Sequence, residues 1–396
     1  MQQVYTAKRD CCGCGTCSLL CPVQAICMET AYDGHRYPLI DPQKCIDCGR
    51  CRGGCAFQKR KPSSANMPLD VYALKHRSED VRMGSTSGGA FTAFSDLILE
   101  HGGVVFGAVL NEQLQVVHTS ARTKAERDAM RGSKYVQSDL NTVFPQIKSL
   151  LRQGTKVMFV GTPCQVDSLK EYLHNEPTEN LLLCDFICHG VPSQQMLDDY
   201  RGYVEKKTGR KIKSHSFRDK SQGWCHEESN LYIDGKKDGV SFFSQVNKFL
   251  FYSGIAQRDS CFACRYTNLN RPGDLTIADF WGIENCMPEF YDEKGVSLVL
   301  LNTPKAVSVF DAVKHTCEYR LATVEDAQMG QPHLSHPLAE SPVRRAFWEE
   351  YRKNGYGSAI RKYVNCGLRG RFSHWTKRVG IYPLLFKMKE ALKGGR

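Results

Sequence analysis

Two runs of cysteine near the start of the chain share one spacing. They read Cys11-x-x-Cys14-x-x-Cys17-x-x-x-Cys21-Pro22 and Cys45-x-x-Cys48-x-x-Cys51-x-x-x-Cys55. This is the pattern of bacterial two-cluster ferredoxins, in which the fourth cysteine of each run ligates the cluster of the other run. The two-residue gaps wrap a turn around one cubane, so that three thiolates reach three irons. We therefore predict two 4Fe–4S clusters, one on Cys11, Cys14, Cys17 and Cys55, the other on Cys45, Cys48, Cys51 and Cys21.

Zinc and disulfides are the alternatives for these cysteines. A zinc site needs one tetrahedral set of four ligands, usually two separated pairs, and two runs of three plus one fit it poorly. Disulfides are expected in exported proteins, and residues 1–5 lead into the cysteines without the apolar core of a signal peptide. We expect a cytoplasmic protein whose 19 cysteines are metal ligands and free thiols. Cys12 adjoins Cys11, so spacing alone selects Cys11 as the ligand.

Four further cysteines could form a third site. Cys261 and Cys264 make a C-x-x-C pair, which suits a redox motif, half a zinc or cluster site, or two ordinary thiols. Cys164 and Cys188 follow predicted strands, and ligand sites collect where strands end in α/β sheets. Four thiolates converging there would hold a third 4Fe–4S cluster. Four unrelated buried cysteines are the alternative at this point.

Two glycine-containing segments have the composition of a nucleotide-cofactor site. Residues 86–90, Thr-Ser-Gly-Gly-Ala, precede a predicted helix and would expose backbone N–H groups to a phosphate, although an ordinary helix cap has the same composition. Residues 132–135, Gly-Ser-Lys-Tyr, add a hydroxyl, a cation and an aromatic ring.

The elements that must position these residues alternate along the chain. A polar, proline-containing stretch at 58–68 indicates a linker. After it, the sequence predicts strands over 71–75, 104–110, 156–160 and 181–187 and helices over 88–100, 141–152 and 193–207. This alternation predicts an α/β core with some parallel strands. Residues 229–243 resemble a hairpin, and the pattern beyond about residue 340 is mostly helical.

Composition and charge limit the classes of partner. Hydrophobic residues make up 41% and charged residues 24%, as in soluble globular proteins, and no apolar run is long enough for a transmembrane segment. The net charge of +11 omits the clusters, each of which brings about two negative charges with its thiolates. We therefore expect no nucleic-acid partner. The basic residues of 361–396 would suit an anionic partner or membrane surface, and we favour a solvated helical face.

Six motifs in order resemble the beta-subunit family of coenzyme F420-reducing hydrogenases and dehydrogenases, from about residue 70 to 300. They are Thr-Ser-Gly-Gly-Ala-Phe (86–91), Gly-Ser-Lys-Tyr-Val-Gln-Ser (132–138), Gly-Thr-Pro-Cys-Gln (161–165), Cys-His-Gly-Val-Pro-Ser (188–193), Cys-x-x-Cys-Arg-Tyr (261–266) and Gly-Asp-Leu-Thr-Ile-Ala-Asp-Phe-Trp-Gly (273–282). This chain has Cys-His-Gly at 188–190 where deazaflavin-using members have Cys-Met-Glu or similar. It therefore resembles the bacterial branch, many of whose members are encoded with enzymes of polysaccharide biosynthesis.

The resemblance implies FAD and a third cluster beside it. The matching cluster ligands are Cys164, Cys188, Cys261 and Cys264, and the matching FAD residues are Thr86, Ser87, Gly88, Gly89, Lys134, Tyr135, Gly161, Thr162 and Pro163. The expected fold is an α+β two-cluster ferredoxin module (1–60), a linker (61–69) and an α/β flavin-binding core followed by a mostly helical C-terminal region (321–396). The core would have two parts, 70–155 and 156–320, the second with the third cluster.

The implied function is an oxidoreductase in which clusters pass single electrons and FAD exchanges two with a small molecule. A ferredoxin-like redox partner is expected, with a sugar nucleotide or glycan intermediate as substrate. The alternative is an electron-transfer protein that delivers electrons to a partner protein. The candidate catalytic residues are His189, Arg218 and Lys220. A hydrogen bond to a cluster sulfur is an equal possibility for His189, as is a surface turn with internal ion pairs for the stretch 216–224, in which Trp224 could stack on a substrate.

Overall fold

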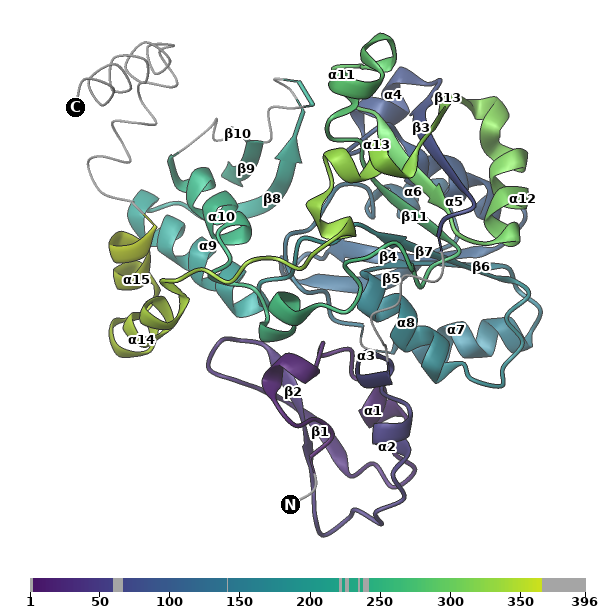
Figure 1. The fold of residues 1–396 in the computed structure, drawn as a ribbon. Coiled ribbons are helices and arrows are strands. Elements are labelled where there is room, and N and C mark those ends of the chain that lie inside the picture. Colours follow the sequence, from purple (N-terminus) through teal and green to yellow (C-terminus); the bar gives the residue numbers. More distant parts are fainter. Residues whose placement is uncertain are drawn as a thin grey trace, which may run out of the picture.

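One mixed sheet of eight strands forms the centre of the computed structural model, in the order β13-β3-β12-β11-β7-β6-β4-β5 (Figure 1). The neighbours β4, β6, β7 and β11 are parallel, and the outer pairs are antiparallel. The strands are β3 (Asp70–His76), β4 (Val104–Leu110), β5 (Val116–Ala121), β6 (Val157–Gly161), β7 (Leu181–Phe186), β11 (Leu275–Asp279), β12 (Ser297–Leu301) and β13 (Cys317–Ala322). The predicted α/β core with parallel strands is confirmed.

The structure describes residues 3–59, 67–140, 142–220, 223–224, 228–233, 236–237 and 242–364. Most of the predicted linker 61–69, Cys225, Cys366 and the basic tail over 365–396 lie outside these residues.

Alternate residues of the strands enter two different cores, as the two-residue period of a strand requires. Leu182 and Cys184 of β7 face the core made with α5 (Ala90–Glu100) and α12 (Pro304–Val313). Leu181 and Leu183 face the core made with α7 (Val143–Arg152) and α8 (Pro163–Tyr172). Both faces of the sheet are therefore covered, which explains the continuous apolar sequence of its central strands.

A smaller antiparallel sheet lies beside the large one. It contains β8 (Ile212–Asp219), β9 (Glu228–Ile233) and β10 (Lys236–Lys237), and it shares a hydrophobic core with α9 (Gln194–Thr208), α10 (Phe242–Tyr252), α14 (Arg344–Asn354) and α15 (Tyr356–Tyr363). The hairpin predicted over 229–243 is therefore shorter than expected, because α10 begins at Phe242. Val246 and Leu250, one helical turn apart, are both buried in that core. The helices α14 and α15 confirm a mostly helical region after residue 340.

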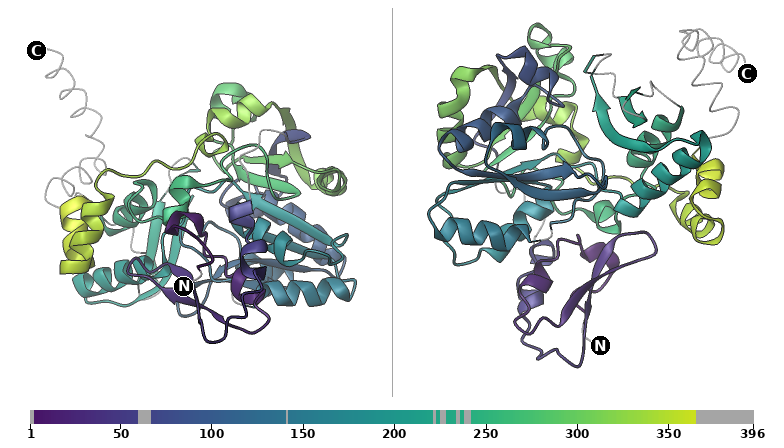
Figure 2. Two further views of the ribbon diagram at one scale, coloured as in Figure 1. Left: turned by 60° about the horizontal axis from the view of Figure 1, so that its bottom comes forward. Right: turned by 180° about the vertical axis from the view of Figure 1, so that it is seen from behind.

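The N-terminal module, residues 3–59, lies below the large sheet in Figure 1 and in the right view of Figure 2. Its strands β1 (Ile26–Thr30) and β2 (Arg36–Ile40) pair antiparallel. Its helices are the short η1 (Lys8–Asp10), α1 (Thr16–Leu19), α2 (Arg50–Gly53) and α3 (Ala56–Lys59). Both α1 and α3 contact α8 of the core.

The remaining elements are short. They are α4 (Glu79–Met83), α6 (Lys124–Asp128), η2 (Asp259–Ala263), α11 (Ile283–Cys286), η3 (Pro288–Phe290), η4 (Lys314–Thr316), α13 (Val324–Met329) and η5 (Pro332–Leu334). None of the helices in the described ranges is long and apolar enough to cross a bilayer.

Candidate functional site

A cavity of about 290 Å³ opens where the parallel strands β6, β7 and β11 end. Its wall includes Gly161 at the end of β6, Ile187 just after β7 and Asp279 at the end of β11. The carboxyl ends of parallel strands meet at one edge of a sheet, and loops leaving that edge form the usual ligand site of α/β folds. A cavity therefore lies at the strand ends where the sequence predicted a site, and it is called the main cavity below.

All four cysteines of the predicted third set line this cavity. Cys164 lies in the first turn of α8, Cys188 follows β7, and Cys261 and Cys264 lie in and directly after η2. Burial raises the pKa of Cys261 to about 12 and also raises the pKa of Cys188. These two thiols are therefore neutral at pH 7 unless a metal binds, and a metal would bind them as thiolates.

The first ferredoxin-type set lines a second, smaller cavity inside the N-terminal module. Cys11, Cys14, Cys17 and Cys55, the four residues predicted to share a cluster, all belong to its wall. Cys12 lines this cavity and the main one as well. Cys12 forms a small buried cluster with Phe57 and Tyr266, and cysteines of both sets pack against this cluster: Cys14 and Cys55 of the first set, and Cys164 and Cys264 of the third.

The second ferredoxin-type set includes an exposed cysteine, whereas the cysteines of the first set are all partly buried. Cys21, Cys45 and Cys51 pack against the small apolar cluster of the module, while Cys48 is exposed. The backbone N–H of Ala25 donates a hydrogen bond to Cys21 Sγ over 3.2 Å. No group of three His, Cys, Asp or Glu side chains in the described part of the chain is close enough to hold a metal ion.

The duplication seen in the sequence is also present in the backbone of the module. Gly15 and Gly49 follow Cys14 and Cys48 and have φ angles of +78° and +71°. Each glycine precedes a single-turn helix, α1 or α2. The left-handed conformation favours glycine at both positions, so the two runs fold into the same local turn.

The two glycine-containing segments predicted to bind FAD lie side by side at the main cavity. Thr86 Oγ1 accepts a hydrogen bond from the backbone N–H of Ser133 over 3.0 Å, and both residues line the cavity. Gly89, with φ +97°, precedes the first residue of α5, so the N-terminus of this helix faces the cavity.

Ser87 and Gly88 serve the packing of this loop against the sheet. The Ser87 hydroxyl donates to Val296 O over 2.9 Å, and a Cβ at Gly88 would lie 2.3 Å from Leu74 O. Only glycine fits at position 88, because the backbone of β3 is in contact with it. The Ser-Gly pair at 87–88 is therefore explained in part by the packing of this loop against the sheet, and not by ligand binding alone.

Lys134 and Tyr135 line the cavity, and neighbouring residues fix the positions of both side chains. Lys134 Nζ donates to the carbonyls of Ala129, Met130 and Arg131, over 2.9 to 3.1 Å, and burial lowers its pKa to about 7. The Tyr135 ring stacks on Phe251, with 3.9 Å between ring centroids. Lys134 thus closes its own turn, and Tyr135 belongs to an aromatic wall.

The motif after β6 begins helix α8. The Thr162 N–H donates to Gln165 Oε1 over 3.0 Å in a capping box, and Pro163 occupies the first helical position. The Thr162 hydroxyl lies 3.2 Å from Cys164 Sγ. Gly161, Thr162 and Pro163 all line the cavity.

The three candidate catalytic residues have different positions. His189 and Arg218 line the cavity, and the His189 ring meets the His333 ring edge-on at 4.7 Å. Lys220 is not in the wall, because its buried ammonium donates to the carbonyls of Arg82, Ser87 and Lys294. Lys220, predicted as a catalytic residue, therefore lies outside the wall of the main cavity and joins three backbone segments.

Arg218 is fixed by the carboxylate at the end of β11. Asp279 forms an ion pair with the Arg218 guanidinium and accepts a hydrogen bond from Trp224 Nε1 over 2.6 Å. Trp224 is buried and stacks on Trp281, with 4.8 Å between ring centroids, so it supports the wall instead of stacking on a substrate.

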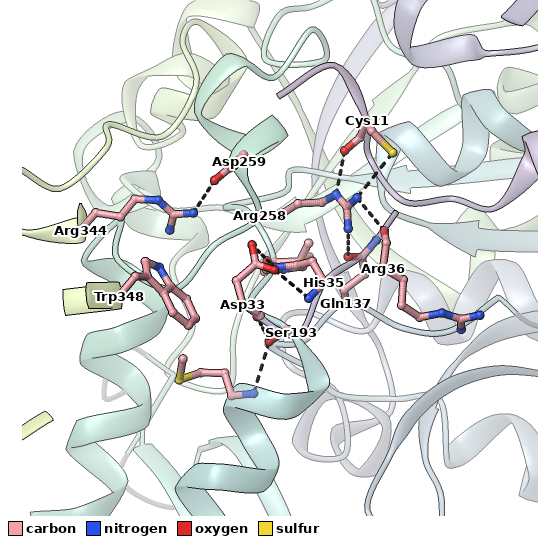
Figure 3. A network of polar contacts seen from close by, with 12 residues as sticks. Cys11, Asp33, His35, Arg36, Gln137, Ser193, Arg258, Asp259, Arg344 and Trp348 are labelled. Carbon is pink, nitrogen blue, oxygen red and sulfur yellow. Dashed lines mark hydrogen bonds and ion pairs between the residues drawn. The ribbon is translucent and has the colours of Figure 1, made fainter. Parts of the chain in front are cut away.

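Two residues that no sequence motif marked as ligands, Gln137 and Arg258, also line the main cavity. Gln137 Nε2 donates to Cys12 O over 2.8 Å, and Arg258 Nε donates to Cys11 O over 2.7 Å (Figure 3). The available sequence signals were the position of Gln137 within the motif 132–138 and that of Arg258 three residues before Cys261.

Comparison with known proteins shows one family match and one structural likeness. Residues 154–327 match the family that comprises the C terminus of the coenzyme F420 hydrogenase/dehydrogenase beta subunit. The chain is also similar to a chain in the structure "Xenon derivatization of the F420-reducing [NiFe] hydrogenase complex from Methanosarcina barkeri". The identity is 16% and the TM-score 0.46, over 77% of this chain and 95% of that one. No curated protein matches. The matched residues 154–327 contain all four cysteines of the third set, so this part of the chain is similar to the C terminus of the coenzyme F420 hydrogenase/dehydrogenase beta subunit.

Proposed function

We propose that this chain is an iron–sulfur flavoprotein that transfers electrons between ferredoxin-type clusters and a small molecule reacting at FAD. One observation carries the proposal. The wall of a single cavity contains Cys164, Cys188, Cys261 and Cys264 together with Thr86, Ser87 and Gly89 of one loop and residues 132–135 of the other. Four thiols supply the ligands of one 4Fe–4S cluster. The two loops supply glycines, hydroxyls and a helix N-terminus for a nucleotide cofactor.

The arrangement of the cysteine sets supports an electron relay. The second ferredoxin-type set packs against the apolar cluster of the module, the first set lines the inner cavity, and Cys12 lines both that cavity and the main one. A row of clusters in these places would lead from the module surface to the cavity. Because each cluster passes one electron and most substrate reductions need two, FAD would supply two-electron chemistry at the end of the row.

The residues of the main cavity fit FAD in charge and polarity. The N-termini of α5 and α8 both reach the wall, and their partial positive charge suits the pyrophosphate. The stacked rings of Tyr135 and Phe251 give the same wall an aromatic surface. Thr86, Ser133 and Thr162 add hydroxyl groups.

A small-molecule substrate is favoured over direct delivery of electrons to a partner protein. The cluster ligands line a hollow and not a flat face, and ligand pockets of this kind enclose small molecules. Arg218, which is paired with Asp279, places a cation at this cavity. His189 would supply a ring nitrogen for proton transfer. An anionic substrate such as a sugar nucleotide or glycan intermediate fits this chemistry.

A ferredoxin-like redox partner would bind the module at its exposed cysteine. Cys48 is exposed, and the neighbouring Ile46 side chain is 62% exposed. An apolar residue beside an exposed cluster ligand would let a partner approach closely. Electrons would then enter at the second cysteine set.

Anaerobic reduction of the full chain tests the relay. Reduced ferredoxin should bleach the flavin absorbance of the wild-type protein, and C188A should retain flavin and the iron of the module but reduce its flavin far more slowly. The matched control C286A alters a cysteine that does not line the cavity and should behave as wild type. Equal rates in all three proteins would contradict the proposed relay.

A further inference from the structure

A buried arginine lies at the junction between the N-terminal module and the core. Arg258 is only 1% exposed and precedes the η2 segment that carries Cys261. Its Nε donates to Cys11 O over 2.7 Å, its Nη2 to Arg36 O over 2.8 Å, and its Nη1 to Gln137 Oε1 over 3.2 Å (Figure 3). One side chain from the core thus holds two segments of the module.

Other buried arginines of this chain are paired with carboxylates, each at 2.6 Å: Arg127 with Asp96, Arg271 with Asp185, and Arg344 with Asp259. Arg258 has no carboxylate partner among the described residues, and its hydrogen bonds go to carbonyl and amide oxygens and to sulfur. Burying a charge without a counter-charge costs several kcal/mol. The charge of Arg258 therefore points to an anion at this junction.

The candidate anion is a cluster bound by the first cysteine set. Arg258 Nη2 lies 3.5 Å from Cys11 Sγ, within hydrogen-bond distance for a sulfur acceptor. A 4Fe–4S cluster with four thiolates carries about two negative charges. Such a cluster on Cys11, Cys14, Cys17 and Cys55 would supply the missing counter-charge.

Two residues of the module, Gly13 and Tyr37, surround the Arg258 guanidinium. Gly13 has φ +72°, and a Cβ at this position would lie 2.5 Å from Arg258 Nη1. The face of the Tyr37 ring covers the guanidinium carbon at 4.1 Å from the ring centroid. Both residues belong to the module, so the module and the core are built around this one cation.

We propose that Arg258 is a positioning residue that raises the reduction potential of the cluster bound by Cys11 and fixes this cluster beside the third cysteine set. A cation and an N–H donor at a ligating sulfur stabilise the reduced cluster, which carries one more negative charge. The inference rests on the proposed function, because it requires the first set to hold a cluster.

An EPR-monitored redox titration of the anaerobically purified full chain tests this role. R258Q removes the charge, and R258K keeps it without the fork of donors that reaches both Cys11 and Arg36. R36Q is the matched control, because the half-exposed Arg36 side chain pairs with Asp139 across the same junction and donates to that carboxylate instead of a sulfur. Iron is quantified in each protein.

We expect the potential of one cluster to become more negative in R258Q, to fall less in R258K, and to stay unchanged in R36Q. Unchanged potentials in both Arg258 variants with full iron would overturn the inference. Loss of the cluster from both variants would overturn it as well, because Arg258 would then serve only to fold the module. If the wild-type protein contains no 4Fe–4S cluster, the proposed function itself fails.

Discussion

The N-terminal module and the sheet core differ in what holds them together. The module's own apolar cluster has three buried residues, Val4, Ile26 and Ile40, and the side chains packed on it include four cysteines. The core has eight strands with apolar residues buried on both faces. A unit of about 60 residues with so small an apolar centre needs metals or other cross-links to fold. The proposed clusters would therefore fold the module, whereas side-chain packing folds the core.

Iron removal should separate the two regions most clearly. Treatment of the anaerobic protein with a chelator is expected to unfold residues 3–59 and to leave the large sheet intact, because only the module needs metal in order to fold. Hydrogen exchange with peptide-level mass spectrometry should show nearly complete loss of protection in β1 and β2. Full protection of β4, β6 and β7 is the internal control. Retained protection of the module without iron would contradict this view.

Removal of one cysteine of the third set should affect only the cluster that this set is proposed to bind. C261A is expected to lose about four irons, one cluster's worth, while the module keeps its own. The control C286A should keep all its iron, since Cys286 does not line the cavity. Full iron in C261A would show that the third set holds no cluster, and loss of all iron would show that the two regions are not independent.

The Arg218–Asp279 pair should contribute to the stability of the core alone. The Arg218 side chain is 3% exposed, so D279N leaves a buried guanidinium without its carboxylate. We expect the free energy of unfolding of the core to fall by about 3 kcal/mol, as for other broken buried pairs. The control D311N breaks the exposed pair with Lys314 and should cost about 0.5 kcal/mol or less. Denaturant unfolding monitored in the sheet measures both, and equal costs would contradict the assignment.

Acid should weaken the core through His118. Burial lowers its pKa from 6.5 to about 4, and its ring stacks on Phe159 within the sheet. Because the unfolded chain binds the proton first, stability falls as the pH drops from about 6.5 towards 4. The loss at pH 5 is about 2 kcal/mol. Unfolding of wild type and H118Q at pH 7 and pH 5 tests this, and an equal fall in both proteins would contradict it.

The sequence predicted those parts of the site that depend on short-range spacing. The proposed ligands Cys11, Cys14 and Cys17 would have to reach one cubane, so their spacing would record the chemistry directly. Strands such as 104–110 were recognisable from their apolar sequences. Arg258 and Lys220 could not be placed in this way, because their partners lie far away in the chain and only the fold brings them together. The hairpin over 229–243 was overextended because Phe242 and Phe243 fit a strand as well as a helix.

The central claim is that three clusters and one flavin share this chain. Anaerobic purification followed by quantification of iron, acid-labile sulfide and flavin tests it most directly. We expect about twelve irons, about twelve sulfides and one FAD per chain. Zinc in place of iron, or a protein that neither retains nor binds flavin, would contradict it.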